Sequence, residues 1–338
     1  MKETVLVTGG AGYIGSHTAV ELIQAGFDVV IADNLSNSDL QAVEGVRRIT
    51  SAEVPFEQID CCDLQAMRRL FERHEFRSVI HFAASKAVGE SVAEPLKYYR
   101  NNLLSFLNVV ELMCDFGRPN ILFSSSCTVY GEPDAQPVTE QTPRKPATSP
   151  YGNTKQISED ILRDAVAAHP GLRGIALRYF NPIGSHPSAL IGELPRGVPQ
   201  NLVPYVTQTA AGIRECLSIF GNDYPTPDGT CIRDYIHVLD LATGHVKALE
   251  RLKKNAGLDI YNLGTGIGYS VLDVIHNFEA ATGITIPFEF KPRRAGDIPV
   301  NYSNADKAWK ELGWKAQYGI KEMCEDSWRW QSSNPNGY

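Results

Sequence analysis

The chain has 338 residues, of which 43% are hydrophobic and 21% charged, and it carries a formal net charge of −7. This length allows about two domains with large cores, and the composition excludes a disordered or fibrous chain. The negative charge also argues against a general nucleic-acid-binding surface, although a few cationic side chains or backbone N–H groups could still hold an anionic ligand.

The N-terminal segment enters an apolar run at once and shows no basic region followed by an apolar stretch and a cleavage site, so we expect no signal peptide. No run of about 18 apolar residues occurs, and no membrane span is expected. The cysteines are odd in number and include no C-x-x-C pair, which favours reduced thiols over disulfides or a zinc site. We therefore expect a soluble cytoplasmic protein without a metal.

The first half of the chain alternates short apolar runs with longer helical patterns. Strands are predicted at 4–8, 28–33, 56–59, 78–82, 121–125 and 175–179. Helices are predicted between them at 14–25, 64–74, 98–116 and 151–168. Because apolar strands separated by helices form parallel sheets covered on both faces, we predict an α/β fold with a doubly wound, Rossmann-type sheet.

After residue 181 prolines and glycines become frequent and the alternation stops. We therefore predict a first domain at 1–181 and a smaller mixed α/β domain at 182–338, with some segments of the second half crossing back to the first domain. Two long loops, 185–200 and 222–230, are candidates for function because long loops in compact proteins are often functional.

A glycine-rich turn follows the first predicted strand and precedes a helix, and it reads Gly9-Gly10-Ala11-Gly12-Tyr13-Ile14-Gly15. Glycines here permit a tight turn and a close approach of backbone to pyrophosphate, and the helix N-terminus offers free N–H groups. The spacing is Gly-x-x-Gly-x-x-Gly rather than the commoner Gly-x-Gly-x-x-Gly. A bare glycine triplet is more often a simple loop, but the strand–turn–helix context favours a dinucleotide site.

Asp33 closes the second predicted strand about 20 residues after that turn, where a carboxylate can accept hydrogen bonds from a ribose diol. A carboxylate there would repel a 2′-phosphate, so NAD is favoured over NADP. The alternative is a turn or cap residue before Asn34. Asp60, after the third strand, could similarly reach the adenine end.

A second glycine-rich stretch occupies 264–268. Ser270 followed by Asp273 is typical of a capping box at a helix start. We therefore interpret this stretch as a structural loop rather than a second nucleotide site.

Tyr151 and Lys155 lie four residues apart, and Pro150 suits the first turn of a helix, so the two side chains should share one face. A tyrosine normally has a pKa of about 10, and a neighbouring ammonium favours its phenolate. Ser126 ends the fifth strand at the carboxyl edge, where ligands bind in such sheets. Taken alone, the Tyr–Lys pair is equally consistent with an idle helix surface.

Several motifs together carry a family resemblance. They are 5–17, 81–91, Ser124-Ser125-Ser126-Cys127-Thr128-Val129-Tyr130-Gly131, Tyr151-x-x-x-Lys155, Arg178-Tyr179-Phe180-Asn181-Pro182, 220–225, 233–238 and 261–264. With them the chain resembles the extended short-chain dehydrogenase/reductase family over nearly its whole length, and within it the nucleotide-sugar 4-epimerases.

The resemblance implies an NAD-dependent interconversion of UDP-glucose and UDP-galactose through a 4-keto intermediate. It implies that Tyr151 is the acid/base, that Lys155 tunes it and holds the nicotinamide ribose, and that Ser126 hydrogen-bonds the reacting hydroxyl. The implied NAD site comprises Gly9, Gly12, Tyr13, Ile14, Gly15, Asp33, Asn34, Asp60, Cys61, Phe82, Ala83, Lys86, Asn101 and Tyr179. The implied UDP-hexose site comprises Ser126, Tyr151, Asn181, Asn201, Phe220, Arg233, Tyr235, Arg294, Asp297 and Asn301. A homodimer formed through the helices at 98–116 and 151–168 is also implied, although their apolar faces are equally consistent with an intramolecular core.

Residues 127 and 128 distinguish the chain from enzymes with related chemistry. Nucleotide-sugar 4,6-dehydratases carry an Asp-Glu pair where this chain has Cys127 and Thr128, and UDP-glucuronate decarboxylases carry Glu at the second position. Neither Cys nor Thr does carboxylate acid/base work, so elimination is disfavoured. A non-catalytic NAD-binding sensor of the same fold is a further alternative. In the family, a tyrosine at the position of Asn301 goes with enzymes confined to UDP-glucose and UDP-galactose, and a smaller residue with acceptance of N-acetylated sugars. Because Tyr302 is the next residue, the family position could align with either 301 or 302.

Overall fold

The computed structural model describes residues 2–254, 257–294 and 296–338. Its largest element is a seven-stranded sheet in the order β10-β6-β5-β4-β1-β2-β3. All its neighbouring strands pair in parallel, which confirms the predicted doubly wound α/β fold. In chain order the strands are β1 (Thr4–Thr8), β2 (Asp28–Asp33), β3 (Phe56–Gln58), β4 (Ser78–His81), β5 (Asn120–Ser126), β6 (Arg173–Tyr179) and β10 (Leu258–Leu263).

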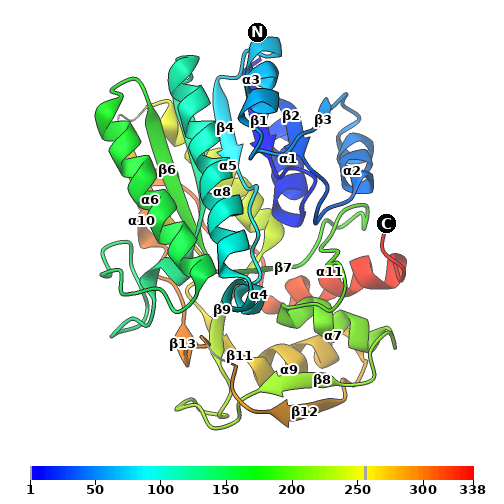
Figure 1. Cartoon of the computed structure of the whole chain (residues 1–338). Helices are drawn as coiled ribbons and strands as arrows, with labels where there is room; N and C mark the ends of the chain where they lie inside the picture. The colour runs from blue at the N-terminus through cyan, green and yellow to red at the C-terminus, as the bar shows by residue number, and fades with distance from the viewer. Residues whose placement is uncertain (1, 255–256, 295) are drawn as a thin grey trace.

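Helices cover both faces of this sheet (Figure 1). One layer consists of α1 (Tyr13–Gln24), α2 (Leu40–Thr50) and α8 (Val238–Leu252). The other consists of α3 (Leu64–Arg73), α5 (Pro95–Asp115) and α6 (Pro150–Ala168). Because strand side chains alternate, Val5 and Val7 face the first layer and Leu6 the second, and all three are fully buried.

Two helices of this domain escaped the sequence prediction. Helix α2 begins after Asp39, whose carboxylate accepts a hydrogen bond from the backbone of Gln41, and α4 (Val88–Ala93) is only six residues long. Helix α4 is too short to show a periodic pattern and owes its stability to tertiary packing. The start of α2 does carry a local signal, the capping residue Asp39, which the sequence prediction overlooked. Elsewhere the predicted elements are present, with ends that differ by a few residues.

The smaller domain lies below the large sheet in Figure 1 and is built around two small sheets. Strand β9 (Ile232–His237) pairs with β7 (Asn181–Ile183), β11 (Gly268–Ser270) and β13 (Val300–Asn301). Strand β8 (Leu217–Phe220) pairs with β12 (Phe288–Lys291). The helices beside them are α7 (Leu202–Ala210), α9 (Val271–Thr282) and α11 (Ile320–Ser333).

Parts of the second half of the chain complete the large sheet. Strand β10 extends it beside β6, α8 packs against α1, and α10 (Asp306–Leu312) packs against β10. The boundary at residue 181 stays a prediction. None of the described helices combines the length and apolar character that a membrane span requires.

Candidate active site

Three serines, Ser124 to Ser126, end β5 at the carboxyl edge of the sheet, between β4 and β6. Ser126 is buried, and its Oγ accepts hydrogen bonds from the backbone N–H and the hydroxyl of Thr128 at 3.2 and 3.0 Å. Thr128 belongs to the 3₁₀ helix η1 (Cys127–Tyr130), which follows the strand directly. Thr128, one of the two residues whose identity disfavours elimination chemistry, therefore orients the Ser126 hydroxyl.

Helix α6 brings Tyr151 and Lys155 to the same edge. It begins at Pro150, and Ser149 caps it by accepting a hydrogen bond from Gly152 N at 3.2 Å. The Lys155 Nζ lies 5.8 Å from the centre of the Tyr151 ring and donates to the Ser124 carbonyl oxygen at 2.6 Å. The predicted helix start and the shared face are confirmed.

Burial dominates the electrostatics of this pair. It raises the pKa of Tyr151 to about 12, against the opposing effect of the Ser126 hydroxyl. It lowers the pKa of Lys155 to about 7, against the attraction of Glu159. Both shifts favour neutral side chains, because desolvation penalises each charged form. The ammonium alone does not produce the phenolate that the spacing suggested.

The glycine turn has the geometry of a phosphate cradle. Gly9 has φ +69°, and a Cβ there would lie 2.7 Å from the backbone nitrogen of Ala83. A Cβ at Gly15 would lie 2.4 Å from the Gly9 carbonyl oxygen. Helix α1 begins at Tyr13 with Gly12 as its N-cap residue, and among the described residues no side chain caps its N-terminus. Tyr13 and Ile14 form its first turn, so the free N–H groups there suit an anion.

Asp33 lies beside this turn at the end of β2. Its carboxylate accepts hydrogen bonds from Ala11 N at 3.1 Å, Leu35 N at 2.9 Å and Ser38 Oγ at 2.8 Å. The contact with Leu35 fits the alternative reading as a turn residue, whereas the contact with Ala11 joins Asp33 to the glycine turn. Both descriptions hold together, because a carboxylate has room for about four hydrogen bonds.

The other expected cofactor residues line the same edge of the sheet. Asp60 accepts a hydrogen bond from Asn34 Nδ2 at 3.2 Å, and its neighbour Cys61 is buried. The Tyr13 hydroxyl donates to Gly184 O at 2.6 Å, which ties α1 to the start of the 185–200 loop.

Three further contacts involve expected cofactor residues. The Asn101 amide lies 3.4 Å from Ser85 Oγ. The rings of Phe82 and Tyr179 lie 4.8 and 5.5 Å from the ring of His245.

The expected substrate residues come together in the smaller domain through strand register. Asn181 on β7 is the register partner of Tyr235 on β9, and Asn301 on β13 is the partner of Arg233. Arg294 and Asp297 form an ion pair at 3.0 Å. The Arg294 guanidinium also lies 4.9 Å from the centre of the exposed Phe220 ring.

Register also separates residue 301 from its neighbour. Partners in adjacent strands point to the same face and successive residues to opposite faces, so Asn301 shares a face with Arg233 and Tyr302 does not. The Tyr302 ring instead approaches Gly268. Asn301 is buried, and within the described part of the chain its Oδ1 has no hydrogen-bond partner.

Sequence reasoning missed Glu193, which lies in the 185–200 loop. Its Oε1 accepts from Lys86 Nζ and from Asn201 Nδ2, both at 2.9 Å, and so joins an expected cofactor residue to an expected substrate residue. The two contacts span 107 and 8 positions of the chain, and no local pattern marks the first.

The second glycine-rich stretch wraps a carboxylate of the chain itself. Thr265 N and Gly266 N donate to the buried Asp234 at 2.9 and 3.1 Å, and a Cβ at Gly264 would lie 2.3 Å from Ser303 Oγ. Ser270 and the third helical residue of α9 form the predicted capping box. The interpretation as a structural loop is confirmed.

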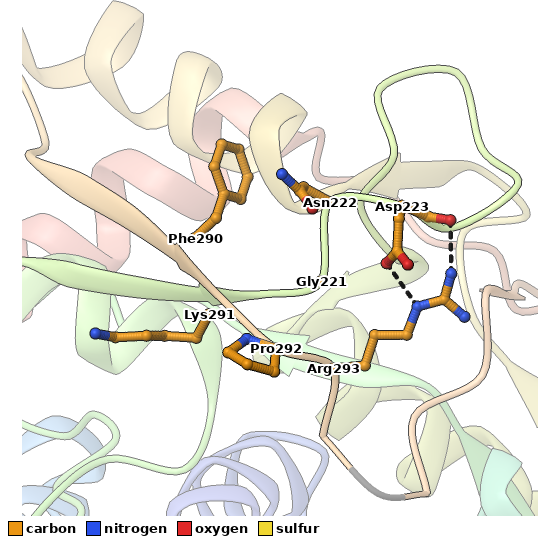
Figure 2. Close-up of a pocket in the computed structure, with 7 residues that line it drawn as sticks. All are labelled: Gly221, Asn222, Asp223, Phe290, Lys291, Pro292 and Arg293. Atoms are coloured by element: carbon orange, nitrogen blue, oxygen red, sulfur yellow. Dashed lines mark hydrogen bonds and ion pairs between the residues drawn. The ribbon is translucent and has the colours of Figure 1, made fainter.

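A surface pocket of about 420 Å³ lies between the ends of β8 and β12, and its lining includes Gly221 and Arg293, which adjoin Phe220 and Arg294 in the chain (Figure 2). Across it, Asp223 accepts hydrogen bonds from Arg293 through its side chain and its carbonyl oxygen. Neither residue was expected in the site. Across residues 2–254, 257–294 and 296–338, no cluster of at least three His, Cys, Asp or Glu side chains could hold a metal ion.

Comparison with known proteins agrees with this geometry. The family model described as GDP-mannose 4,6 dehydratase matches residues 6–327. The UDP-glucose 4-epimerase of Bacillus subtilis (strain 168) is 55% identical over 334 residues, covering 99% of this chain and 98% of the relative. That of Bos taurus is 51% identical over 344 residues, covering 100% and 99%.

A crystal structure of UDP-glucose 4-epimerase from Bifidobacterium longum, in complex with NAD+ and UDP, superposes with a TM-score of 0.97 at 50% identity and covers 99% of this chain and 100% of that one. The family model bears the name of a dehydratase, but the carboxylate pair of that chemistry is replaced by Cys127 and Thr128. The chain therefore belongs to the UDP-glucose 4-epimerase family, within the extended short-chain dehydrogenases/reductases.

Proposed function

We propose that this chain interconverts UDP-glucose and UDP-galactose by removing and returning the hydrogen at C4 of the sugar, with NAD as a retained cofactor. The observation that carries the proposal is the meeting of Ser126, Tyr151 and Lys155 at the carboxyl edge of a parallel sheet, beside a glycine turn that leads into α1. Ligands of open α/β sheets bind at this edge.

The residues present fit a dinucleotide. The uncapped N-terminus of α1 offers N–H groups to a pyrophosphate, and Gly9 and Gly15 leave the space that a Cβ would fill. Asp33 already accepts from three donors and has room for about one further hydrogen bond, from a ribose hydroxyl, which supports NAD over NADP. When bound, NAD would accept the C4 hydride and return it, so that no net oxidation occurs.

The chain's own residues move the proton. Tyr151 takes the proton of the 4-hydroxyl as a phenolate and gives it back, and Ser126 hydrogen-bonds the same hydroxyl. Because burial raises the pKa of Tyr151 to about 12, the protein alone holds the phenol protonated, and forming the phenolate needs additional positive charge nearby. Lys155, when protonated, and the oxidised nicotinamide are the two candidate sources.

Side chains of the smaller domain would hold the UDP group. Arg233 and Arg294 suit bidentate contacts with the diphosphate, and Phe220 offers an exposed ring at the end of β8. The remaining contacts are assigned to Asn181, Asn201, Tyr235 and Asp297. The 4-keto sugar then turns its other face to the hydride while the UDP stays fixed.

We also propose that UDP-N-acetylglucosamine and UDP-N-acetylgalactosamine are accepted. Asn301 is small, and it shares the face of Arg233. Its unpartnered Oδ1 is a buried acceptor that an acetamido N–H could satisfy.

We further propose a homodimer in a reducing, cytoplasmic setting. Helix α5 exposes Leu96, Leu104 and Leu107 by 79, 40 and 45%, and apolar side chains grouped on a helix often mark an interface. All seven cysteines lie in the described part of the chain and are free, as thiols are in reducing compartments.

The test is conversion of UDP-galactose to UDP-glucose by the purified protein with its bound NAD. Tyr151→Phe should reduce the rate by several orders of magnitude and leave the NAD content unchanged. Absence of turnover in the wild-type protein, despite bound NAD, would favour the sensor alternative. A retained rate in Tyr151→Phe would remove tyrosine from the mechanism.

A further inference from the structure

A buried ion pair lies directly behind the catalytic residues. Arg178 on β6 donates to both carboxylate oxygens of Glu159 on α6, at 2.7 and 2.9 Å, and both side chains are only 3% exposed. Replacing a buried ion pair by well-packed apolar residues is often neutral or stabilising. Stability by itself is therefore a weak reason for these two residues to be here.

The pair is tied to the catalytic residues by a regular arrangement. Tyr151, Lys155 and Glu159 follow one another at intervals of four along α6, so they share one face of the helix. The three serines at the end of β5 each hold one of them. Ser124 O accepts from Lys155 Nζ at 2.6 Å, Ser125 Oγ donates to Glu159 Oε1 at 2.6 Å, and the Ser126 hydroxyl interacts with Tyr151.

We propose that Glu159 and Arg178 are a positioning pair for the epimerase reaction, which fixes Lys155 and sets the electrostatic potential at Lys155 and Tyr151. This inference rests on the proposed function. Neither member of the pair is expected to touch the substrate or the cofactor, because both side chains are only 3% exposed. They would act through Lys155 and the strand that carries Ser126.

The charges around Lys155 determine in which direction its pKa shifts. Glu159 raises the pKa of Lys155 and burial lowers it to about 7, so a small change in potential alters its protonation near neutral pH. Arg144 lies 3.6 Å from the Glu159 carboxylate and adds a partly exposed positive charge. Among the described residues, His81 on β4 and Tyr151 on α6 also face Lys155. Tyr130 on η1 and the carboxylate of Glu140 face Arg178, and Tyr179 on β6 faces Tyr151.

Replacing one member of the pair leaves the buried charge of the other unpaired. In Glu159→Gln the unpaired guanidinium makes the potential at Lys155 and Tyr151 more positive, so both side chains lose their protons at lower pH. In Arg178→Gln the unpaired carboxylate has the opposite effect. In the double variant both charges are gone, and the two amides can hydrogen-bond to each other.

The experiment compares the pH dependence of kcat and KM for the NAD-bound wild type, the two single variants and the double variant. We expect the midpoint of the kcat profile to move by about one pH unit, downward in Glu159→Gln and upward in Arg178→Gln. The double variant should return to within about 0.3 unit of wild type. The proposal would be overturned if the midpoints of the two single variants moved in the same direction, or if neither folded single variant showed a shift. A purely structural role would lower stability without moving the two midpoints in opposite directions.

Two further measurements keep the test decisive. Phenolate absorbance, taken as the difference between each protein and its Tyr151→Phe counterpart, follows the same proton without turnover, so it still reports if the proposed epimerisation fails. If a single variant does not fold, Ser125→Ala keeps both charges but removes one donor to Glu159, and its midpoint should rise by a few tenths of a pH unit. An unchanged profile in folded Ser125→Ala would then overturn the proposal.

Discussion

Replacing Asp234 by Asn should destabilise the protein strongly, because this carboxylate is the centre of the smaller domain's polar core. Asp234 is fully buried on β9. Its Oδ1 accepts from Thr265 N and Oγ1 at 2.9 and 2.7 Å. Its Oδ2 accepts from Gly266 N at 3.1 Å and from Ser303 N and Oγ at 3.1 and 2.5 Å.

The magnitude follows from these five donors. An amide replaces one oxygen by an NH₂ group, which then faces N–H donors instead of accepting from them. If the NH₂ group faces Thr265, the Thr265 hydroxyl can rotate to accept from it, but the Thr265 backbone N–H loses its acceptor. If the NH₂ group takes the other orientation, the backbone N–H groups of Gly266 and Ser303 lose their acceptor. Each buried unsatisfied donor costs about 1–3 kcal/mol, and the remaining bonds lose their charge assistance. We expect a total loss of about 3–5 kcal/mol in the free energy of unfolding.

Urea unfolding followed by tryptophan fluorescence measures this loss as a lower midpoint at unchanged m-value. Asp223→Asn is the matched control, because Asp223 lies at the surface pocket of Figure 2 and its side chain is 68% exposed in an ion pair with Arg293. Exposed ion pairs contribute little to stability, because solvent and salt screen them. If Asp234→Asn lost no more stability than Asp223→Asn, the five-donor account would be refuted.

Three further predictions concern pH, substrate range and assembly. Burial lowers the pKa of His17 and His81 to about 3 and of His245 to about 4, so the unfolded chain binds more protons than the folded one below pH 6.5. Stability should therefore be complete above pH 6.5 and fall on acidification, by about 2 kcal/mol per histidine at pH 5, and urea midpoints that stay constant from pH 7 to 5 would contradict this. Asn301→Tyr should abolish turnover of the N-acetylated UDP-sugars while retaining that of UDP-galactose, and equal exclusion by both forms would disprove the role of residue 301. Leu104→Glu should shift the protein toward monomers in analytical ultracentrifugation at unchanged thermal stability, because it places a charge on an exposed apolar face; an unaltered sedimentation coefficient for a dimeric wild type would place the interface elsewhere.

Features carried by short stretches of the chain could be read before the fold was known. The strand–turn–helix at Gly9 to Gly15, the carboxylate at the end of the second strand and the Tyr151–Lys155 spacing all depend on neighbours within a few turns. The capping box at Ser270 is equally local, and it separated the second glycine-rich loop from a nucleotide site. The resemblance to a family then extended these local readings to the substrate residues.

Contacts between distant parts of the chain were decided only by the tertiary structure. Asp234 meets Thr265 and Ser303 across 31 and 69 positions, and Lys86 meets Glu193 across 107. Packing likewise decided the sign of the pKa shift at Tyr151, because desolvation outweighs the nearby ammonium and a sequence does not show how deeply a side chain is buried. The sequence by itself thus determined which groups could do the chemistry, since backbone geometry and spacing are local, whereas burial and long-range pairing determined their charge and their partners.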